Sequence, residues 1–108
     1  MDKSEILEIA AKGINAEGDL IDDGFVVFKG SHARKDVTSS CNENVVNLRN
    51  QLLKDGIMVE QEDSLKFMED YIFNSPSMAG TVILGRATNG WTAWKNKEGK
   101  TLDELKRR

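Results

Sequence analysis

The stretch from residue 75 to residue 95 restricts the local structure more strongly than any other part of the chain. Ser75 and Pro76 are typical of a helix start: the serine side chain accepts a hydrogen bond from the first turn, and the proline occupies a position whose amide is unpaired. Gly85 is typical of a helix end, because glycine adopts the left-handed backbone conformation without steric cost. The sequence therefore predicts a helix over residues 76–84.

Asn89-Gly90 follows this helix and indicates a tight turn, with an extended segment over residues 91–95 behind it. In an extended segment Trp91 and Trp94 point to opposite faces, since side chains alternate with a period of two. We therefore expect at least one of the two rings in the core. The other ring either packs there as well or is exposed and able to stack on a nucleic-acid base.

A second main helix is expected over residues 41–55. Ser40 and Glu43 have the spacing of a capping box, and Gly56 follows as a left-handed stop. Arg49 is expected at the flank of the apolar stripe that faces the core. The stripe consists of Val45, Val46, Leu48, Leu52 and Leu53.

The first thirty residues favour strands, although residues 6–16 fit either a helix or a strand by their spacing. Asp22-Asp23-Gly24 is typical of a hairpin turn, and it predicts strands near residues 6–17 and 25–32. Gly30 permits a bend or bulge in the second of these strands.

Shorter elements complete the predicted fold. Short strands are expected at residues 57–60, 65–68 and 71–73, and a capping box from Thr101 to Glu104 predicts a short C-terminal helix. The predicted fold class is α+β, with a small, mostly antiparallel sheet and the two main helices packed on it.

Composition narrows the class of protein. The chain has 108 residues and a formal net charge of -3 at pH 7, which suits a single domain over residues 1–108 that we expect to be a monomer. One cysteine, Cys41, and one histidine, His32, provide neither an internal disulfide nor a usual zinc site. We therefore expect no metal, no cofactor and a cytoplasmic location. The longest apolar run, residues 25–28, is far too short to cross a membrane.

The charge is distributed unevenly. Residues 29–54 carry five basic and two acidic side chains, and residues 71–108 carry seven and three. These two basic blocks either share one face and attract a nucleic acid or belong to solvated loops of mixed charge. The candidate nucleic-acid-binding residues are Lys29, Arg34, Lys35, Arg86, Trp91, Trp94, Lys95 and Lys97.

Other candidate sites have a structural explanation beside the functional one. The hydroxyls of Ser75 and Ser77, together with free amides at the predicted helix start, either bind an anion or only cap the helix. Ser31 and His32 are neighbours whose side chains point apart in a strand, and no third group is placed to orient the histidine. We expect that the protein is not an enzyme.

Several motifs in order along the chain resemble the domain of unknown function 4357 (DUF4357). They are Gly13 to Gly18, Gly24 to Ser31, Leu48-Arg49 through Gly56-Ile57, Phe73 to Ser77, Asn89-Gly90-Trp91 and Trp94-Lys95. The resemblance covers roughly residues 6–105 and implies an accessory domain of the kind often found C-terminal to GIY-YIG nucleases. The chain itself has neither a GIY nor a YIG triplet.

Part of the chain is also similar to the restriction enzyme and adenine methylase associated domain. The residues on that pattern are Ser75, Pro76, Ser77, Ala79, Gly85, Asn89, Gly90, Trp91 and Trp94. Gly80 departs from the pattern, where alanine is commoner. Both resemblances imply a module that accompanies DNA-processing enzymes.

Two functions are therefore expected from the sequence. The first is a non-catalytic domain that binds DNA through the basic residues and a tryptophan. The second is a protein-interaction or structural module that docks on a nuclease or another partner through an apolar patch near Trp91.

Overall fold

The computed structural model describes residues 6–11 and 13–106, and this part of the chain has an α+β fold. The larger sheet is antiparallel and has the strand order β1-β2-β3-β7, formed by β1 (Leu7–Ala11), β2 (Ile14–Ile21), β3 (Gly24–Val27) and β7 (Tyr71–Phe73). The smaller sheet has the order β4-β6-β5, formed by β4 (His32–Ala33), β6 (Leu65–Phe67) and β5 (Met58–Glu60). The helices are α1 (Glu43–Lys54), α2 (Pro76–Leu84), α3 (Gly90–Ala93) and α4 (Leu102–Lys106). The predicted fold class is confirmed.

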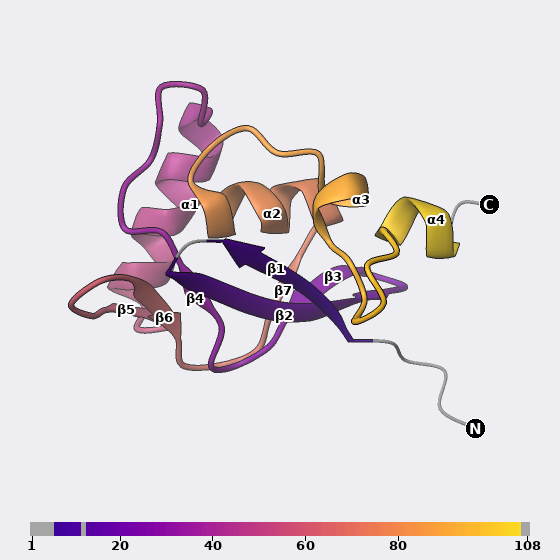
Figure 1. Cartoon of the computed structure of the whole chain (residues 1–108). Coiled ribbons are helices and arrows are strands. Elements are labelled where there is room, and N and C mark those ends of the chain that lie inside the picture. Colours follow the sequence, from indigo (N-terminus) through magenta and orange to yellow (C-terminus); the bar gives the residue numbers. More distant parts are fainter. Residues whose placement is uncertain (1–5, 12, 107–108) are drawn as a thin grey trace.

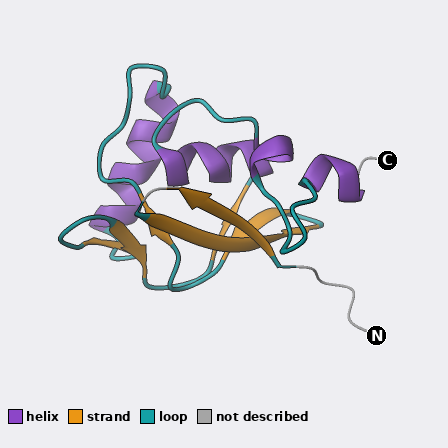
Figure 2. Ribbon diagram, in the orientation of Figure 1, coloured by secondary structure: helices purple, strands orange, loops and turns teal. Residues whose placement is uncertain are grey.

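The helices and sheets form two layers. Figure 1 shows α2, α3 and α4 over the same face of the larger sheet, with α1 at the end nearest the smaller sheet. The long connections before α1 and between α2 and α3 have no regular structure (Figure 2). None of the helices within residues 6–11 and 13–106 has the length and apolar composition needed to cross a membrane.

Residues 6–17 form two strands, whereas the sequence predicted one. The chain reverses at Gly13, whose φ of 76° is in the region that favours glycine, and Ala11 pairs with Ile14 across the reversal. The alternative of a helix over residues 6–16 is wrong. The predicted turn at Asp22-Asp23-Gly24 is confirmed, so β1, β2 and β3 form an antiparallel meander.

Ser31 connects the two sheets at the bend that Gly30 was predicted to allow. The Ser31 hydroxyl accepts from the Glu17 amide at 3.0 Å and donates to the Glu17 carbonyl at 3.2 Å, which attaches it to β2. Its backbone carbonyl accepts from the Phe67 amide of β6 at 2.8 Å. The predicted strand over residues 25–32 is therefore divided into β3 and β4, which lie in different sheets.

Helix α1 is present where it was predicted, but its cap is different. Asn42 is the N-cap, and its side-chain oxygen accepts from the Val45 amide at 3.0 Å. The predicted capping box from Ser40 to Glu43 is therefore wrong. The Ser40 hydroxyl instead accepts from the Ala87 amide at 3.2 Å, which ties the loop before α1 to the segment after α2.

The remaining short elements agree with the prediction. Strands β5, β6 and β7 lie within the expected segments. At the start of α4 the capping box is complete, because the Thr101 amide donates to the Glu104 carboxylate at 2.9 Å and the Glu104 amide donates to the Thr101 hydroxyl at 3.2 Å.

Helix α2 occupies the predicted residues and is the centre of the fold. It contacts α1, α3 and both sheets, and its buried residues include every position from Ala79 to Leu84. It ends at Gly85, whose φ of 70° confirms the predicted left-handed stop. A helix surrounded in this way needs apolar or small residues on all sides, which explains its composition.

Candidate functional site

Helix α3 replaces the turn and extended segment that were predicted for residues 89–95. The Asn89 side chain caps this short helix by accepting from the Trp91 amide at 3.0 Å. Asn89-Gly90 is thus a helix start, because asparagine favours N-caps as strongly as it favours turns. A short antiparallel bridge between Lys95 and Glu8 connects the end of this segment to β1.

Helix α3 closes the N-terminus of α2. The Ser75 hydroxyl accepts from the Met78 amide at 3.0 Å, and the Ser77 hydroxyl accepts from the Gly90 amide at 2.9 Å. The backbone of Gly90 lies directly on this first turn, since a Cβ there would overlap the carbonyl of Pro76 and the amide nitrogen of Ser77. The Ser75 hydroxyl thus caps α2, and the Ser77 hydroxyl joins α2 to α3. These bonds favour the capping alternative, and anion binding at Ser75 and Ser77 stays a prediction.

Trp94 is a core residue. Its ring is 0% exposed, its centroid lies 4.4 Å from that of Phe25, and its Nε1 donates to the carbonyl of Pro76 at 3.1 Å. The prediction that at least one tryptophan packs in the core is confirmed. The inclusion of Trp94 among the nucleic-acid-binding residues is wrong, because the ring has no free face on which a base can stack.

Trp91 is half-buried and packs against the margin of the core. The two rings differ in burial because Trp91 lies within helix α3 and Trp94 follows it, and not because side chains alternate along a strand. Trp91 retains some exposed surface, but it is not among the residues that line the groove described next.

A groove of about 370 Å³ runs along the outer edge of β1. Three of the predicted cations line it: Arg86, which follows the end of α2, and Lys95 and Lys97, which follow α3. Leu84 and Ala93 contribute apolar surface from the helices. The strand side of the groove is formed by Glu8, Ile9, Ala10 and Ala11.

The three cations of this groove have exposed side chains. Backbone hydrogen bonds fix the positions of two of them. Lys95 is fixed by two hydrogen bonds with Glu8, and Lys97 lies in a turn in which the Asn96 side chain accepts from the amides of Glu98 and Lys100, both at 2.9 Å. Among the described residues, none of the three cations makes an ion pair. With one carboxylate on the groove, that of Glu8, the lining has an excess of positive charge.

The first basic block lies elsewhere. Lys35 is 3.5 Å from the Glu60 carboxylate and donates to the carbonyl of Glu62 at 2.7 Å, so acidic neighbours offset its charge. Lys29 follows β3, where its amide donates to the Asp70 carboxylate at 2.7 Å. Arg34 is exposed, and its amide donates to the Ile83 carbonyl at 2.8 Å, which places its backbone beside the end of α2.

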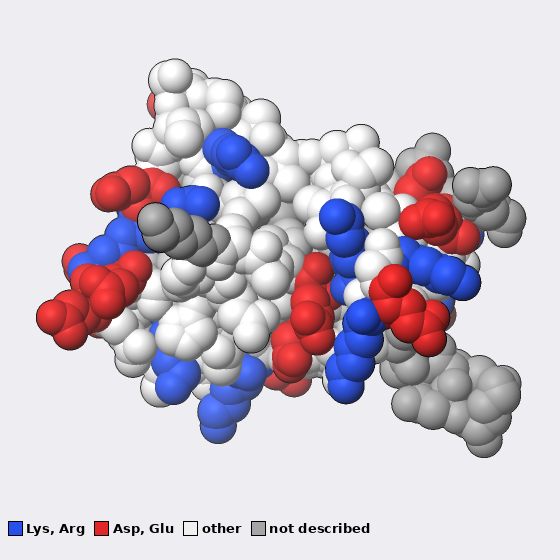
Figure 3. Space-filling view, in the orientation of Figure 1, with Lys and Arg blue, Asp and Glu red and all other residues white. Residues whose placement is uncertain are grey.

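The two basic blocks therefore do not merge into one patch around a tryptophan. Figure 3 shows basic and acidic side chains interleaved on the displayed face, with no continuous basic surface. The structure brings together Arg86, Lys95 and Lys97 in one groove and leaves Lys29 and Lys35 beside acidic residues.

Arg49 is a residue whose role the sequence analysis missed. It is 4% exposed, and its guanidinium donates to the carbonyls of Val82, Arg34 and Lys35, the last at 3.2 Å. Burial lowers the pKa of this guanidinium from its usual value. Arg49 thus fastens the loop before α1 to the last turn of α2. Arg49 lies in the same helical row as Val45 and Leu52, and this spacing could have predicted its burial. The sequence analysis placed it at the flank of the row instead.

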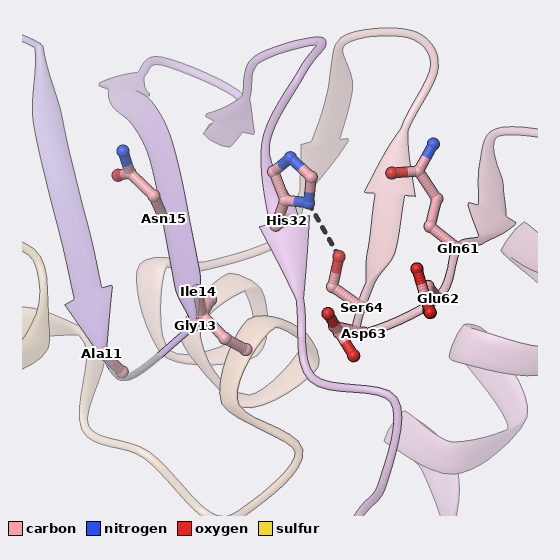
Figure 4. A pocket seen from close by; sticks show the side chains of 9 residues that line it. All are labelled: Ala11, Gly13, Ile14, Asn15, His32, Gln61, Glu62, Asp63 and Ser64. Atoms are coloured by element: carbon pink, nitrogen blue, oxygen red, sulfur yellow. Dashed lines mark hydrogen bonds between the residues drawn. The ribbon is translucent and has the colours of Figure 1, made fainter.

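A second hollow, of about 470 Å³, lies between the β1–β2 turn and the loop before β6 (Figure 4). His32 Nδ1 and the Ser64 hydroxyl are 2.8 Å apart there, and Glu62 and Asp63 lie beside them. Ser64 is 5% exposed, and in Figure 4 the second ring nitrogen of His32 points away from both carboxylates. The pair lacks the accessible nucleophile and the oriented histidine that acyl transfer requires.

The burial pattern, the two antiparallel sheets and the central α2 define a small α+β domain with a basic groove at a strand edge. The family model for the domain of unknown function DUF4357 matches residues 7–106, which is nearly the whole chain. The chain therefore belongs to the DUF4357 family. Comparison with curated proteins and with solved structures gave no match.

Proposed function

We propose that this protein is a non-catalytic accessory domain that binds the phosphate backbone of DNA through the groove of Arg86, Lys95 and Lys97. The observation that carries the proposal is that three exposed cations, from two segments of the chain, line one open groove without ion-pair partners among the described residues. Lysine and arginine side chains that reach phosphates provide most of the affinity of sequence-independent binding.

Arg34 is not part of this site. Its backbone lies beside the end of α2 through the bond to the Ile83 carbonyl, but the residue lines a separate hollow with Asp36, Glu62 and Asp63. The sequence resemblance to modules of DNA-processing enzymes favours a nucleic acid as the ligand.

The test is a pair of triple variants with the same change in charge. Arg86→Gln/Lys95→Gln/Lys97→Gln removes the cations of the groove, and Lys29→Gln/Lys54→Gln/Lys106→Gln removes three exposed cations elsewhere. Binding of labelled duplex and single-stranded DNA is measured by fluorescence anisotropy at several salt concentrations. The groove variant is expected to lower the slope of log affinity against log salt by about 2–3.

The control variant is expected to keep most of the slope, because its cations lie outside the groove. Equal losses in both variants would show that DNA responds to overall charge and would contradict the proposed site. Absence of any salt-dependent binding by the unmodified protein would overturn the function itself.

A second function, docking of a protein partner, is favoured by a different feature. The groove is bounded on one side by the edge of a β-strand, and strand edges pair with other polypeptide backbones. The Trp91 patch that the sequence suggested for this role is half-buried against the core, so the strand edge is the better candidate surface.

A further inference from the structure

The outer edge of β1 is covered over part of its length. At Glu8 the edge is paired: the Glu8 amide donates to the Lys95 carbonyl at 2.7 Å, and the Lys95 amide donates to the Glu8 carbonyl at 3.0 Å. Because this bridge is antiparallel, the residue opposite Ala10 would be Ala93, which is the last residue of α3. The segment before Lys95 is therefore helical, and its pairing with the edge does not extend to Ala10.

The next outward-facing position on this edge is Ala10. In an antiparallel pair, residues alternate between those that bond one neighbour strand and those that bond the other. The backbone of Glu8 bonds outward to Lys95. The alternating positions Leu7, Ile9 and Ala11 therefore bond inward to β2, and the amide and carbonyl of Ala10 point outward. Ala10 is exposed, lines the groove and has no hydrogen-bond partner on this side among the described residues.

This edge differs chemically from a phosphate site. A phosphate accepts hydrogen bonds from amides, but it has nothing to donate to a carbonyl. A second polypeptide strand supplies both a donor and an acceptor in the spacing that Ala10 offers. The open amide and carbonyl of Ala10 therefore match a peptide backbone better than a nucleic-acid backbone.

The surroundings of Ala10 restrict the side chains of such a strand. Every second side chain of an added strand would face the helix side of the sheet, where Leu84 and Ala93 offer a small apolar surface. The rim carries Arg86, Lys95 and Lys97 against the one carboxylate of Glu8. This excess of positive charge is complementary to acidic side chains.

We propose that the edge of β1 at Ala10 binds an extended acidic segment of a partner protein, which continues the sheet next to the bridge between Glu8 and Lys95. The backbone of the segment exchanges two hydrogen bonds with Ala10, and its carboxylates contact the cations of the groove. The segment and DNA would compete for Arg86, Lys95 and Lys97, whereas the contact with Ala10 belongs to the segment alone.

The probe is a synthetic peptide of about eight residues that alternates glutamate and valine, a pattern that suits a half-buried strand. The control peptide alternates lysine and valine. The glutamate peptide is expected to shift the NMR signals of residues 8–11, 86 and 95–97, and the lysine peptide is expected to leave them unchanged. Absence of shifts with the glutamate peptide at about 1 mM would overturn the proposal, because that concentration detects even weak complexes.

The variant Ala10→Pro separates this surface from the DNA site. Proline removes the outward amide without touching the pairing of β1 with β2, and edge strands tolerate it. It is expected to weaken peptide binding about tenfold and to leave DNA binding unchanged. Equal peptide affinity in Ala10→Pro and the unmodified protein would contradict strand addition.

Hydrogen exchange tests the same contact if Ala10→Pro does not fold. In the free protein the amides of Glu8 and Ile9 are expected to exchange slowly and that of Ala10 fast, because Ala10 alone of the three lacks an acceptor. The glutamate peptide is expected to slow exchange at Ala10. An Ala10 amide that stays fast in the presence of bound peptide would rule out the added strand.

Discussion

The segment from residue 75 to residue 97 contains two regions of opposite character. In the helix junction, formed by α2, α3 and the buried Trp94, almost every polar group is satisfied internally. In the groove, formed by Arg86, Lys95 and Lys97 beside β1, cations and a strand edge are open. The same short stretch therefore supplies both the centre of the fold and the candidate binding surface.

The residues of the helix junction identify the family and build the fold, whereas the residues of the groove are available for binding. Ser75, Ser77, Gly90 and Trp94 belong to the most recognisable motif of the chain, and all of them lie in the helix junction. Ser75 caps α2, Ser77 accepts from Gly90, and Trp94 donates to the Pro76 carbonyl. Of the cations of the groove, Lys95 belongs to one of the family's motifs, and Arg86 and Lys97 belong to none. We therefore expect changes in the helix junction to lower stability and changes in the groove to lower binding.

The largest effect is expected for Trp94→Ala. The substitution empties a fully buried site, removes the ring contact with Phe25 and leaves the Pro76 carbonyl without its donor. We expect the free energy of unfolding to fall by about 3–5 kcal/mol in urea denaturation. Trp91→Ala is the matched control and should cost about 1–2 kcal/mol, because that ring is half-exposed. Similar losses in the two variants would contradict the assignment of Trp94 to the core.

Arg49→Met comes next. Methionine keeps much of the volume but leaves the carbonyls of Val82 and Arg34 without the buried donor that bonds them. We expect a loss of about 2–4 kcal/mol in the same assay. Arg49→Lys should recover part of it, since an ammonium can reach fewer of the carbonyls. A loss of stability below about 0.5 kcal/mol is usual for a surface residue. Such a result would contradict the buried role of Arg49 and support the predicted position at the flank.

Gly90→Ala tests the contact between α3 and α2. The new methyl group would overlap the backbone of Pro76 and Ser77, so the two helices must separate. We expect a loss of about 1–3 kcal/mol, measured as a lower urea midpoint with little change in slope. A neutral or stabilising effect would show that α3 does not rest on the first turn of α2.

Substitution of Gly80 by alanine is expected to change stability least, and in the stabilising direction once a neighbouring methyl group is removed. Alanine would add up to about 1 kcal/mol of helix propensity, but its Cβ would lie 3.0 Å from Cγ2 of Thr88. We therefore expect Gly80→Ala to be nearly neutral alone, and stabilising by about 0.5–1 kcal/mol when Thr88→Ser removes that methyl group. Equal effects of Gly80→Ala in the two backgrounds would exclude Thr88 as the reason for glycine here.

The helix junction also shows what the sequence could predict. Ser75, Pro76 and Gly85 act through the local bonds and backbone conformation of their own helix, so the predicted start and end of α2 were correct. The partner of each helix end was not predictable in this way. Gly90 donates to Ser77 and Arg49 reaches Val82 across 33 residues, and a local pattern contains no information about such distant contacts.

Asn89-Gly90 illustrates a different limit. Asparagine followed by glycine suits both a tight turn and a helix cap, and the choice here follows from the packing of Gly90 on α2. The groove was predicted in part, since its three cations were among the candidates. That Lys35 faces Glu60 while Arg86 joins Lys95 and Lys97 depends on the tertiary fold alone.

The most direct test of the groove as the binding surface is an amide-shift map of the unmodified protein during a titration with a short DNA duplex at low salt. We predict that the shifts concentrate at residues 86 and 95–97, and that residues 75–78 and 91 stay nearly unchanged. Shifts centred on Trp91 and the first turn of α2, or on residues 29–35 without the groove, would contradict the account.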